Sequence, residues 1–401
     1  EADLCAGMAA EGAEVTRLGV LPTPALAYIA GVDGAPAAMI SASHNPWPDN
    51  GIKLFAPGGR KLDDGTEAEI ERVLHALVDD AVDGVGDVAQ SATKQEPLMA
   101  HNVPAISWYV AHLLRVVDGR DLSALRVVFD CANGAASTVV TRLANRLHLG
   151  DGSRVINAFP KGRDINDGCG STHPEAAQQL VVSDGANIGL AFDGDADRVI
   201  AIDEHGALVD GDQIMVMAAL DLHARGHLRN DAIAVTVMSN LGLRHALHDA
   251  GITVVETAVG DRNVLLALDE HDLVLGGEQS GHLVFREHAT TGDGVLTGLM
   301  LLDLLARTGR PLSELAAAMT HFPQVLVSVH TGRRADLHAA PGLAAAISEA
   351  EERLGDDGRV LVRASGTEPV VRVMVEAATH ETAEAEAEHL VSAVRSAFST
   401  P

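Results

Sequence analysis

Cysteine, lysine and long apolar runs are all scarce in this chain of 401 residues, and each absence narrows the class of protein. The three cysteines, Cys5, Cys131 and Cys169, have unrelated spacings and form no CxxC pair, which excludes a disulfide framework and favours a reducing, cytoplasmic location. No apolar stretch reaches the length of a membrane span, and the N-terminal residues lack the basic region of a secretion signal. Membrane anchoring and secretion are therefore not expected.

Positive charge is also scarce, because 29 basic residues stand against 56 acidic ones and the formal net charge is −27. Such a chain is not expected to bind nucleic acid or an anionic membrane surface, since both require clustered lysine and arginine. A small anionic ligand stays compatible with the sequence if a few cations gather locally. Only four of the basic residues are lysines, so a lysine inside a motif is informative.

Short β-branched runs alternate with amphipathic helical patterns, which predicts α/β layers with largely parallel sheets. One unit is a strand over 126–129 followed by an Asn-Gly turn and a helix, and another is a strand, helix and strand over 232–259. The C-terminal part instead predicts a smaller α+β domain, with a strand, an antiparallel pair and a terminal helix in 322–330, 359–365, 370–377 and 382–398.

Polar or turn-rich connections near 94–101, 204–211 and 320–323 divide the chain into four predicted domains. The predicted bounds of these domains are 1–98, 99–206, 207–320 and 321–401. The chain begins within an acidic, alanine-rich helical pattern, without an initiator methionine or a start-of-domain signal, so we expect its N-terminus to be truncated.

A serine and a histidine share a tight turn in MISASHNPWPDNGIKLF, residues 39–55. Ser43 and His44 follow a β-like run, and Lys53 comes ten residues after the serine. Asn, Ser and Pro all favour chain reversals, so ordinary turn chemistry also explains the motif. From its residues alone, the segment is either a plain turn or a reactive loop.

Three carboxylates alternate with small residues in LAFDGDADRVIAID, residues 190–203. Asp193, Asp195 and Asp197 lie between two β-like runs and would repel one another unless a cation sat among them. A solvated acidic turn is the plainer alternative. An EF-hand is rejected, because Arg198 stands where that loop needs glycine and the flanks resemble strands. An oxygen-only site with few ligands suits Mg²⁺.

The segment VLGGEQSGHLVF, residues 274–285, combines glycines with polar groups. Gly276, Gly277 and Gly281 allow the backbone to bend closely round a ligand. The groups of the kind that read sugar hydroxyls are Glu278, Gln279, Ser280 and His282. A simple β-hairpin connection explains the segment about as well.

A fourth polar loop lies in VRASGTEPVVRVMVEA, residues 362–377. Arg363 and Arg372 flank Ser365, Gly366 and Thr367, so guanidinium forks, hydroxyls and backbone N–H groups surround one turn. This is the chemistry of a phosphate cradle. Two surface arginines beside a hairpin are the alternative.

Together the four loops resemble the α-D-phosphohexomutase superfamily, most closely its phosphoglucosamine mutase branch. SASHNP is similar to the family's phosphoserine loop, DGDADR to its metal loop, GEQSGH to its sugar-binding loop and RASGTEPVVRVMVE to its phosphate-binding loop. They occur in the family's order, one in each predicted domain. The resemblance implies a four-domain α/β architecture: three α/β domains with mixed sheets and a C-terminal α+β domain.

Two departures from the family pattern stand out. The N-terminal segment with a Gly-Thr-Asp-Gly-Val-Arg-Gly type motif, whose arginine contributes to the active site, is absent from this sequence, which leaves the activity of this chain open. Ala364 stands where many relatives have proline after the arginine, which is expected to loosen the turn without removing a ligand.

The resemblance also implies roles at the reacting centre. Ser43 would carry a phosphoryl group, and Mg²⁺ would be held by Ser43, Asp193, Asp195 and Asp197. Arg198 would contact the phosphate. Lys53 and His44 are both candidates for proton transfer, and burial readily lowers the pKa of a lysine.

Further residues receive roles on the same basis. Arg262 resembles a family arginine that faces the active site, and Lys61 is expected to be a surface charge. The sugar would be held by Glu278, Gln279, Ser280 and His282, with Gln279 governing the choice of sugar. The phosphate that is not reacting would be held by Arg363, Ser365, Gly366, Thr367 and Arg372.

The function implied is a cytoplasmic, Mg²⁺-dependent isomerase that interconverts glucosamine 6-phosphate and glucosamine 1-phosphate through glucosamine 1,6-bisphosphate. In bacteria this reaction feeds UDP-N-acetylglucosamine and cell-wall synthesis. The alternatives are a phosphomannomutase or phosphoglucomutase, and a non-catalytic sugar-phosphate binder. The expected partner is a small hexosamine phosphate, not nucleic acid or membrane, and a homodimer is left open.

Overall fold

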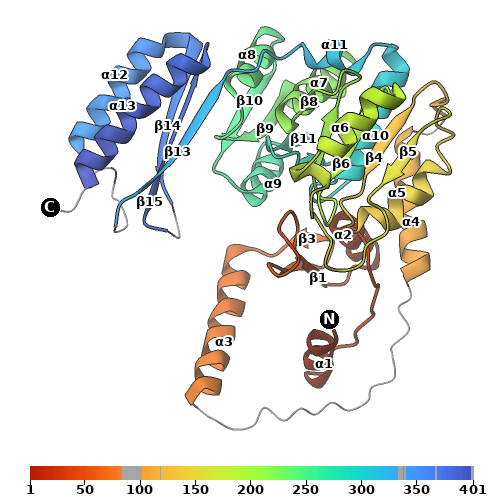
Figure 1. Ribbon diagram of the computed structural model, residues 1–401. Coiled ribbons are helices and arrows are strands. Elements are labelled where there is room, and N and C mark those ends of the chain that lie inside the picture. The colour runs from red at the N-terminus through yellow and green to blue at the C-terminus, as the bar shows by residue number, and fades with distance from the viewer. Residues whose placement is uncertain (84–101, 118, 333–336, 338–339, 366–367, 399–401) are drawn as a thin grey trace. The chain divides into compact units, whose positions relative to one another are not determined.

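The computed structural model describes residues 1–83, 102–117, 119–332, 337, 340–365 and 368–398 (Figure 1). The chain divides into two compact units. The first holds residues 1–237 and 255–316, and the second holds residues 238–254 and 317–401. In the described part, no helix is both long enough and apolar enough to cross a membrane.

The N-terminal part of the first unit builds a three-stranded antiparallel sheet in the order β1-β2-β3. In its register Met39 lies opposite Lys53, so the strand after the serine turn runs back beside the strand before it. Thr23 begins the second helix and Pro24 follows in its first turn, where a missing N–H is tolerated. The elements are α1 (Ala2–Ala10), α2 (Thr23–Asp33), β1 (Ala37–Ser41), β2 (Gly51–Ala56), β3 (Arg60–Lys61) and α3 (Asp64–Asp83).

A five-stranded sheet follows, in the order β5-β4-β6-β7-β8. Strands β5, β4 and β6 are parallel, whereas β7 and β8 are antiparallel to their neighbours. All five residues of β6 are buried and apolar, as expected for the middle of a covered sheet. The elements are α4 (Asn102–Leu114), η1 (Arg115–Val117), β4 (Val127–Asp130), α5 (Ala136–Ala144), β5 (Arg154–Ile156), η2 (Gly170–Thr172), α6 (Glu175–Asp184), β6 (Ile188–Phe192), β7 (Val199–Ile202) and β8 (Leu208–Val209).

The next sheet has the order β10-β9-β11-β12, with β9 and β11 parallel and β11 and β12 joined as an antiparallel hairpin. The strand, helix and strand predicted over 232–259 are confirmed as β9, α8 and β10. The elements are α7 (Gly211–Ala224), η3 (Arg229–Asp231), β9 (Ala232–Thr236), α8 (Leu241–Asp249), β10 (Thr253–Thr257), α9 (Asp261–Glu270), β11 (Leu275–Gly277), β12 (Leu283–Phe285), α10 (Gly294–Thr308) and α11 (Leu312–Ala316).

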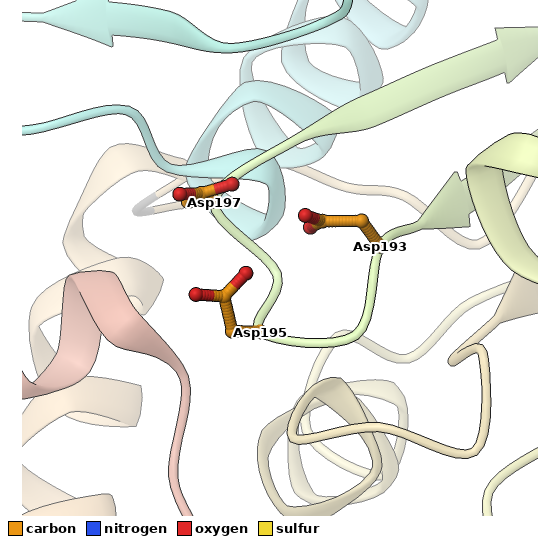
Figure 2. Close-up of side chains that lie close together, drawn as sticks. All are labelled: Asp193, Asp195 and Asp197. Atoms are coloured by element: carbon orange, nitrogen blue, oxygen red, sulfur yellow. The ribbon is translucent and has the colours of Figure 1, made fainter. Parts of the chain in front are cut away.

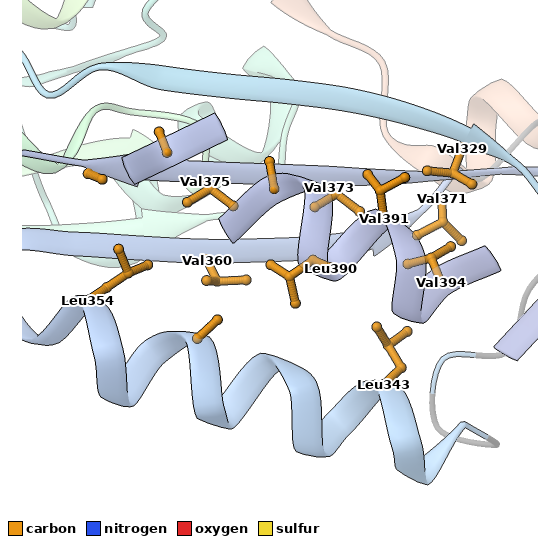
Figure 3. Close-up of a cluster of buried hydrophobic side chains, with 14 of the residues drawn as sticks. Val329, Leu343, Leu354, Val360, Val371, Val373, Val375, Leu390, Val391 and Val394 are labelled. Carbon is orange, nitrogen blue, oxygen red and sulfur yellow. The ribbon is translucent and has the colours of Figure 1, made fainter. Parts of the chain in front are cut away.

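The second unit contains an antiparallel sheet in the order β13-β15-β14, which confirms the pairing predicted between 359–365 and 370–377. Val371, Val373 and Val375 alternate along β15 and face two helices, and Figure 3 shows these side chains beside Leu390 and Leu343. Each buried valine or leucine contributes about 1.5–3 kcal/mol. The elements are β13 (Gln324–His330), α12 (Pro341–Leu354), η5 (Gly355–Asp357), β14 (Gly358–Ala364), β15 (Val370–Ala377) and α13 (His380–Phe398).

The expectation of largely parallel sheets is only partly correct. The β1-β2-β3 sheet is wholly antiparallel, and the two sheets that follow are mixed. The reason is the length of the connections, since a parallel pair needs a crossover of about a dozen residues or more, whereas β2 and β3 are joined by a short turn. The α/β class with mixed sheets is confirmed, and the four predicted domain bounds stay predictions.

Candidate functional site

Three carboxylates converge in the loop between β6 and β7 (Figure 2). One oxygen from each of Asp193, Asp195 and Asp197 lies within 4.8 Å of the others. All three side chains are buried, with exposed fractions of 0%, 3% and 5%. Ala196, between the last two, has a φ of 59°, which turns the chain sharply enough to aim both neighbours inward.

The charges in this loop fit a divalent cation. Asp195 Oδ1 and Asp197 Oδ1 are buried and have no hydrogen-bond partner among the described residues. Burial first, and then the charges of Asp197 and Asp195, raises the pKa of Asp193 well above its usual range. Hard oxygen ligands of this kind suit Mg²⁺, which would remove the mutual repulsion.

Lys53, on β2, supplies part of that compensation in the structure. Its Nζ atom donates to Asp195 Oδ2 at 2.7 Å and to Asp197 Oδ2 at 2.9 Å. Burial lowers the pKa of Lys53, but Asp197 and Asp195 outweigh burial and raise it. The sequence analysis expected burial to lower the pKa of Lys53, and this expectation is wrong. The two carboxylates keep the amine protonated.

The serine turn forms hydrogen bonds with the carboxylate loop and with Asn166 through the side chain and the backbone of Ser43. The Ser43 hydroxyl donates to Asp193 Oδ2 at 3.2 Å. The Ser43 carbonyl accepts from the Gly194 N–H at 3.0 Å and from Asn166 Nδ2 at 2.8 Å. A Cβ on Gly194 would lie 2.5 Å from the Ser43 carbonyl oxygen, so this approach needs glycine. Ser43 has a φ of 50°, which orients the turn at that point.

Thr23 is a residue of this cluster that the sequence analysis missed. Its Oγ1 donates to Asp195 Oδ2 at 2.5 Å, and its backbone N–H donates to the Asp195 carbonyl at 3.0 Å. Its side chain is buried. The only local signal is a Thr-Pro pair at a helix start, which says nothing about a partner so far along the chain.

Arg198 and His44 flank the carboxylates. The Arg198 backbone N–H donates to Asp193 Oδ1 at 3.2 Å, and its Nε lies 3.8 Å from Asp197 Oδ1. His44 is on the exposed side of the serine turn. Partial burial and the charge of Arg198 lower the pKa of His44, which favours a neutral imidazole.

The hairpin between β11 and β12 lies directly against the carboxylate loop. The Gly281 carbonyl accepts from the Val199 N–H at 3.1 Å, one residue beyond Arg198. Gly281 has a φ of +90°, and a Cβ there would lie 2.2 Å from the Val199 carbonyl oxygen. Glu278 Oε1 accepts from the Gly260 N–H at 3.2 Å. The predicted sugar-binding loop is therefore both a hairpin and a neighbour of the carboxylates.

Lys61 is not the surface charge that the sequence analysis expected. It forms an ion pair with Asp261, and both side chains are mostly buried. His282 is 2% exposed and its Nε2 lies 3.5 Å from Asp261 Oδ2. Burial raises the pKa of the Asp261 carboxyl, but His282 and Lys61 outweigh burial and lower it. The partner of Lys61 is 200 residues away in sequence, so no local pattern indicates it.

Four family models match nearly the whole chain. They are described as phosphoglucomutase/phosphomannomutase alpha/beta/alpha domains I, II and III and the C-terminal domain, and they match residues 1–79, 108–206, 210–322 and 326–393. The chain belongs to the phosphoglucomutase/phosphomannomutase family. It is accordingly an isomerase of the phosphotransferase type.

Individual proteins resemble this chain in sequence or in fold. The chain is 50% identical over 399 residues to a protein named phosphoglucosamine mutase from Frankia casuarinae, covering 99% of this chain and 85% of that protein. A family member from Burkholderia thailandensis has a similar structure, with a TM-score of 0.75, 25% identity, and coverage of 99% and 86%. N-acetylphosphoglucosamine mutase of Aspergillus fumigatus, solved with GlcNAc-6P and magnesium, shares the fold, with a TM-score of 0.70, 23% identity, and 98% of each chain covered.

Arg262 and the predicted phosphate-binding loop each make contacts within their own unit. Arg262 Nη1 pairs with Glu67 of α3 at 2.8 Å. In the second unit, Arg363 and Arg372 face each other across β14 and β15, and burial together with Arg372 lowers the pKa of Arg363. The Ser365 N–H donates to the Val370 carbonyl at 2.8 Å, and residues 366 and 367 lie outside the described part.

Proposed function

We propose that this phosphohexomutase interconverts glucosamine 6-phosphate and glucosamine 1-phosphate by moving a phosphoryl group through Ser43. The observation that carries the proposal is the Ser43 hydroxyl at 3.2 Å from Asp193, in a cluster of three buried carboxylates. The relatives named phosphoglucosamine mutase, such as the one at 50% identity over nearly the whole chain, support the sugar.

The reaction needs two phosphoryl transfers that mirror each other. In the first, the Oγ–P bond of phosphorylated Ser43 breaks, a sugar hydroxyl forms a new O–P bond, and the proton of that hydroxyl passes to a base. In the second, the other phosphate of the bisphosphate returns to Ser43, and a proton returns to the sugar oxygen. The sugar leaves with its phosphate on the other end, and the enzyme is phosphorylated again.

The chain's own residues prepare these transfers. Asp193, Asp195, Asp197 and an oxygen on Ser43 would hold Mg²⁺, which when bound supplies charge neutralisation for a transferring phosphoryl group. Arg198, beside Asp197, adds a fixed positive charge at the same edge. His44 and Lys53 remain the two candidates for the proton. The neutral imidazole favoured at His44 suits acceptance, and the protonated amine of Lys53 suits donation.

The sugar and its idle phosphate are assigned to separate loops. Glu278, Ser280 and His282 would hold sugar hydroxyls, and Gln279 would distinguish an amino sugar from a hexose. The idle phosphate would be bound by Arg363, Ser365, Gly366, Thr367 and Arg372. A cytoplasmic location and a homodimer remain predictions.

Phosphate on Ser43 is the direct test. Mass spectrometry of the purified protein should find one phosphate in the peptide that contains Ser43. The phosphorylated protein should convert glucosamine 6-phosphate faster than glucose 6-phosphate or mannose 6-phosphate. Turnover of a hexose phosphate in preference would assign the enzyme to a sibling activity, and phosphate elsewhere would reject Ser43 as the carrier.

The Ser43→Ala variant tests whether the Ser43 hydroxyl is needed for turnover. It should abolish turnover while leaving the thermal unfolding temperature close to that of the parent, because the hydroxyl sits on a partly exposed turn and not in a core. Turnover within tenfold of the parent would show that another group carries the phosphate.

A further inference from the structure

We infer that Asp210 is a positioning residue that sets the choice of sugar by orienting the side-chain amide of Gln279. This inference rests on the proposed function, since it assumes that Gln279 meets the sugar. It concerns a residue outside the four motifs, at the start of α7. Its basis is the contact between that helix start and the β11–β12 hairpin.

The first turn of α7 lies against the hairpin through its backbone. The Gly211 N–H donates to the Gln279 carbonyl at 3.0 Å. A Cβ on Gly211 would lie only 2.2 Å from the Glu278 carbonyl oxygen, so the close approach requires glycine. The backbone of Gln279 is therefore held at a set position relative to its neighbour Asp210.

The Asp210 carboxylate then binds both the helix and the glutamine. Its Oδ1 accepts from the Gln213 N–H at 3.0 Å, which caps α7, and its Oδ2 accepts from Gln279 Nε2 at 3.2 Å. An ionised carboxylate has no hydrogen to donate, so only the NH₂ end of the amide can face it. The opposite atom, Gln279 Oε1, accepts no hydrogen bond from the described residues, and the side chain is half-buried.

A carbonyl oxygen presented in this way suits an amino sugar. The ammonium group of a glucosamine phosphate can only donate hydrogen bonds, so it needs an acceptor, whereas a sugar hydroxyl both donates and accepts. Gly281, two residues after Gln279, accepts from the Val199 N–H next to Arg198, so the hairpin that carries Gln279 contacts the carboxylate loop. If the amide were reversed, its N–H groups would face the ammonium, and the preference for the amino sugar would be lost.

The deciding variant is Asp210→Asn. Its amide oxygen can still cap α7, while its NH₂ group would donate to Gln279 Oε1 and reverse the amide. We expect the ratio of kcat/KM for glucosamine 6-phosphate over glucose 6-phosphate to fall by about tenfold or more, as for loss of a hydrogen bond to a charged group. This ratio should fall because kcat/KM for glucosamine 6-phosphate decreases, while kcat/KM for glucose 6-phosphate stays within threefold of the parent.

Two further variants separate orientation from helix stability. Gln213→Ala removes the other half of the capping box, whose side chain accepts from the Asp210 N–H at 3.3 Å, and leaves the Gln279 contact in place. It should lower the unfolding temperature without changing the substrate ratio. The double variant Asp210→Asn with Gln279→Glu returns an acceptor to the hairpin with the same total charge, and should restore the preference for glucosamine 6-phosphate.

Each outcome has one meaning. If the parent enzyme shows no preference for glucosamine 6-phosphate, the proposed function is wrong and this inference falls with it. If the parent has the preference and Asp210→Asn keeps it, the inference alone is wrong. An equal loss of the ratio in Gln213→Ala, or no rescue by the double variant, would also overturn it, because the effect would then come from the helix start.

Discussion

At the residue scale, the two carboxylate oxygens of Asp195 have different surroundings. Its Oδ2 accepts from Thr23 and from Lys53, while its Oδ1 has no hydrogen-bond partner in the described part of the chain. One oxygen is thus held in place by the protein, and the other is available to a cation. Thr23 would therefore influence a bound metal only through Asp195, without contact with the metal.

We predict a large effect on Mg²⁺ binding for a substitution of Asp195 and a smaller one for a substitution of its partner Thr23. Asp195→Asn should weaken Mg²⁺ binding and turnover together by at least about tenfold, because it removes one of three gathered charges. Thr23→Val replaces the hydroxyl with a methyl group of similar size, so it should have a smaller effect in the same direction. Calorimetric titration with Mg²⁺ and activity against Mg²⁺ concentration measure both. An unchanged metal requirement in Asp195→Asn would move the cation elsewhere.

Among the elements, the start of α10 supports the carboxylate loop. The Gly294 N–H donates to the Ala196 carbonyl at 3.0 Å. Asp293 caps the helix by accepting from the Leu296 N–H at 2.9 Å, and it also accepts from the Tyr109 hydroxyl of α4 at 2.7 Å. The acid is fully buried, and burial raises the pKa of Asp293 to about 6.

This raised pKa makes stability depend on pH. The carboxyl has a pKa near 3.9 in an unfolded chain, so the folded state holds its proton more tightly. The protonated Asp293 carboxyl therefore contributes to the free energy of unfolding. This contribution is fully present below about pH 4 and is lost as pH rises through about 6. The loss is of order 3 kcal/mol, at about 1.4 kcal/mol for each unit of pKa difference.

We predict that Asp293→Asn removes this dependence, because its amide oxygen can still cap α10 but does not ionise. The stability of the variant relative to the parent should therefore increase as pH rises from 4 to 7. Urea unfolding without Mg²⁺ at several pH values measures the difference. Tyr109→Phe is the control, since it keeps the acid and should keep the pH dependence. Parallel curves for the parent and Asp293→Asn would contradict the prediction.

At the scale of the whole molecule, the proposed function assigns residues of both units to the reaction. The first holds Ser43 and the carboxylates, and the second holds Arg363 and Arg372. A phosphoryl group that leaves one end of the sugar must be replaced from the other. The bisphosphate must therefore turn over without escaping while its idle phosphate stays bound.

We predict that Arg363→Ala with Arg372→Ala leaves Ser43 phosphorylated and Mg²⁺ bound but lowers kcat/KM by on the order of 10², since misplacement of a substrate costs about that much. It should also release more bisphosphate, because charge-assisted phosphate contacts are lost. Incubation of the phosphorylated variant with glucosamine 6-phosphate, with separation of bisphosphate from monophosphate, tests both effects. Loss of Ser43 phosphate or metal would assign the arginines to the reacting centre, and no change would make the loop a plain hairpin.

The sequence alone indicated the α/β class, most strands, and the four loops with Ser43, the three aspartates and Gln279. These features are readable because each depends on residues close together in the chain: a buried apolar run predicts β6, and alternating acids after it predict a shared cation. The antiparallel pairing of 359–365 with 370–377 was readable for the same reason.

Only the tertiary structure decided which distant groups complete these loops. Thr23 meets Asp195 across 172 residues, and Asp210 meets Gln279 across 69. The direction of the Lys53 pKa shift was likewise decided by the structure, because it depends on how closely two carboxylates approach a buried amine. A local pattern states what a residue can do chemically, but burial and neighbouring charge, which depend on folding, determine which of those chemistries it adopts.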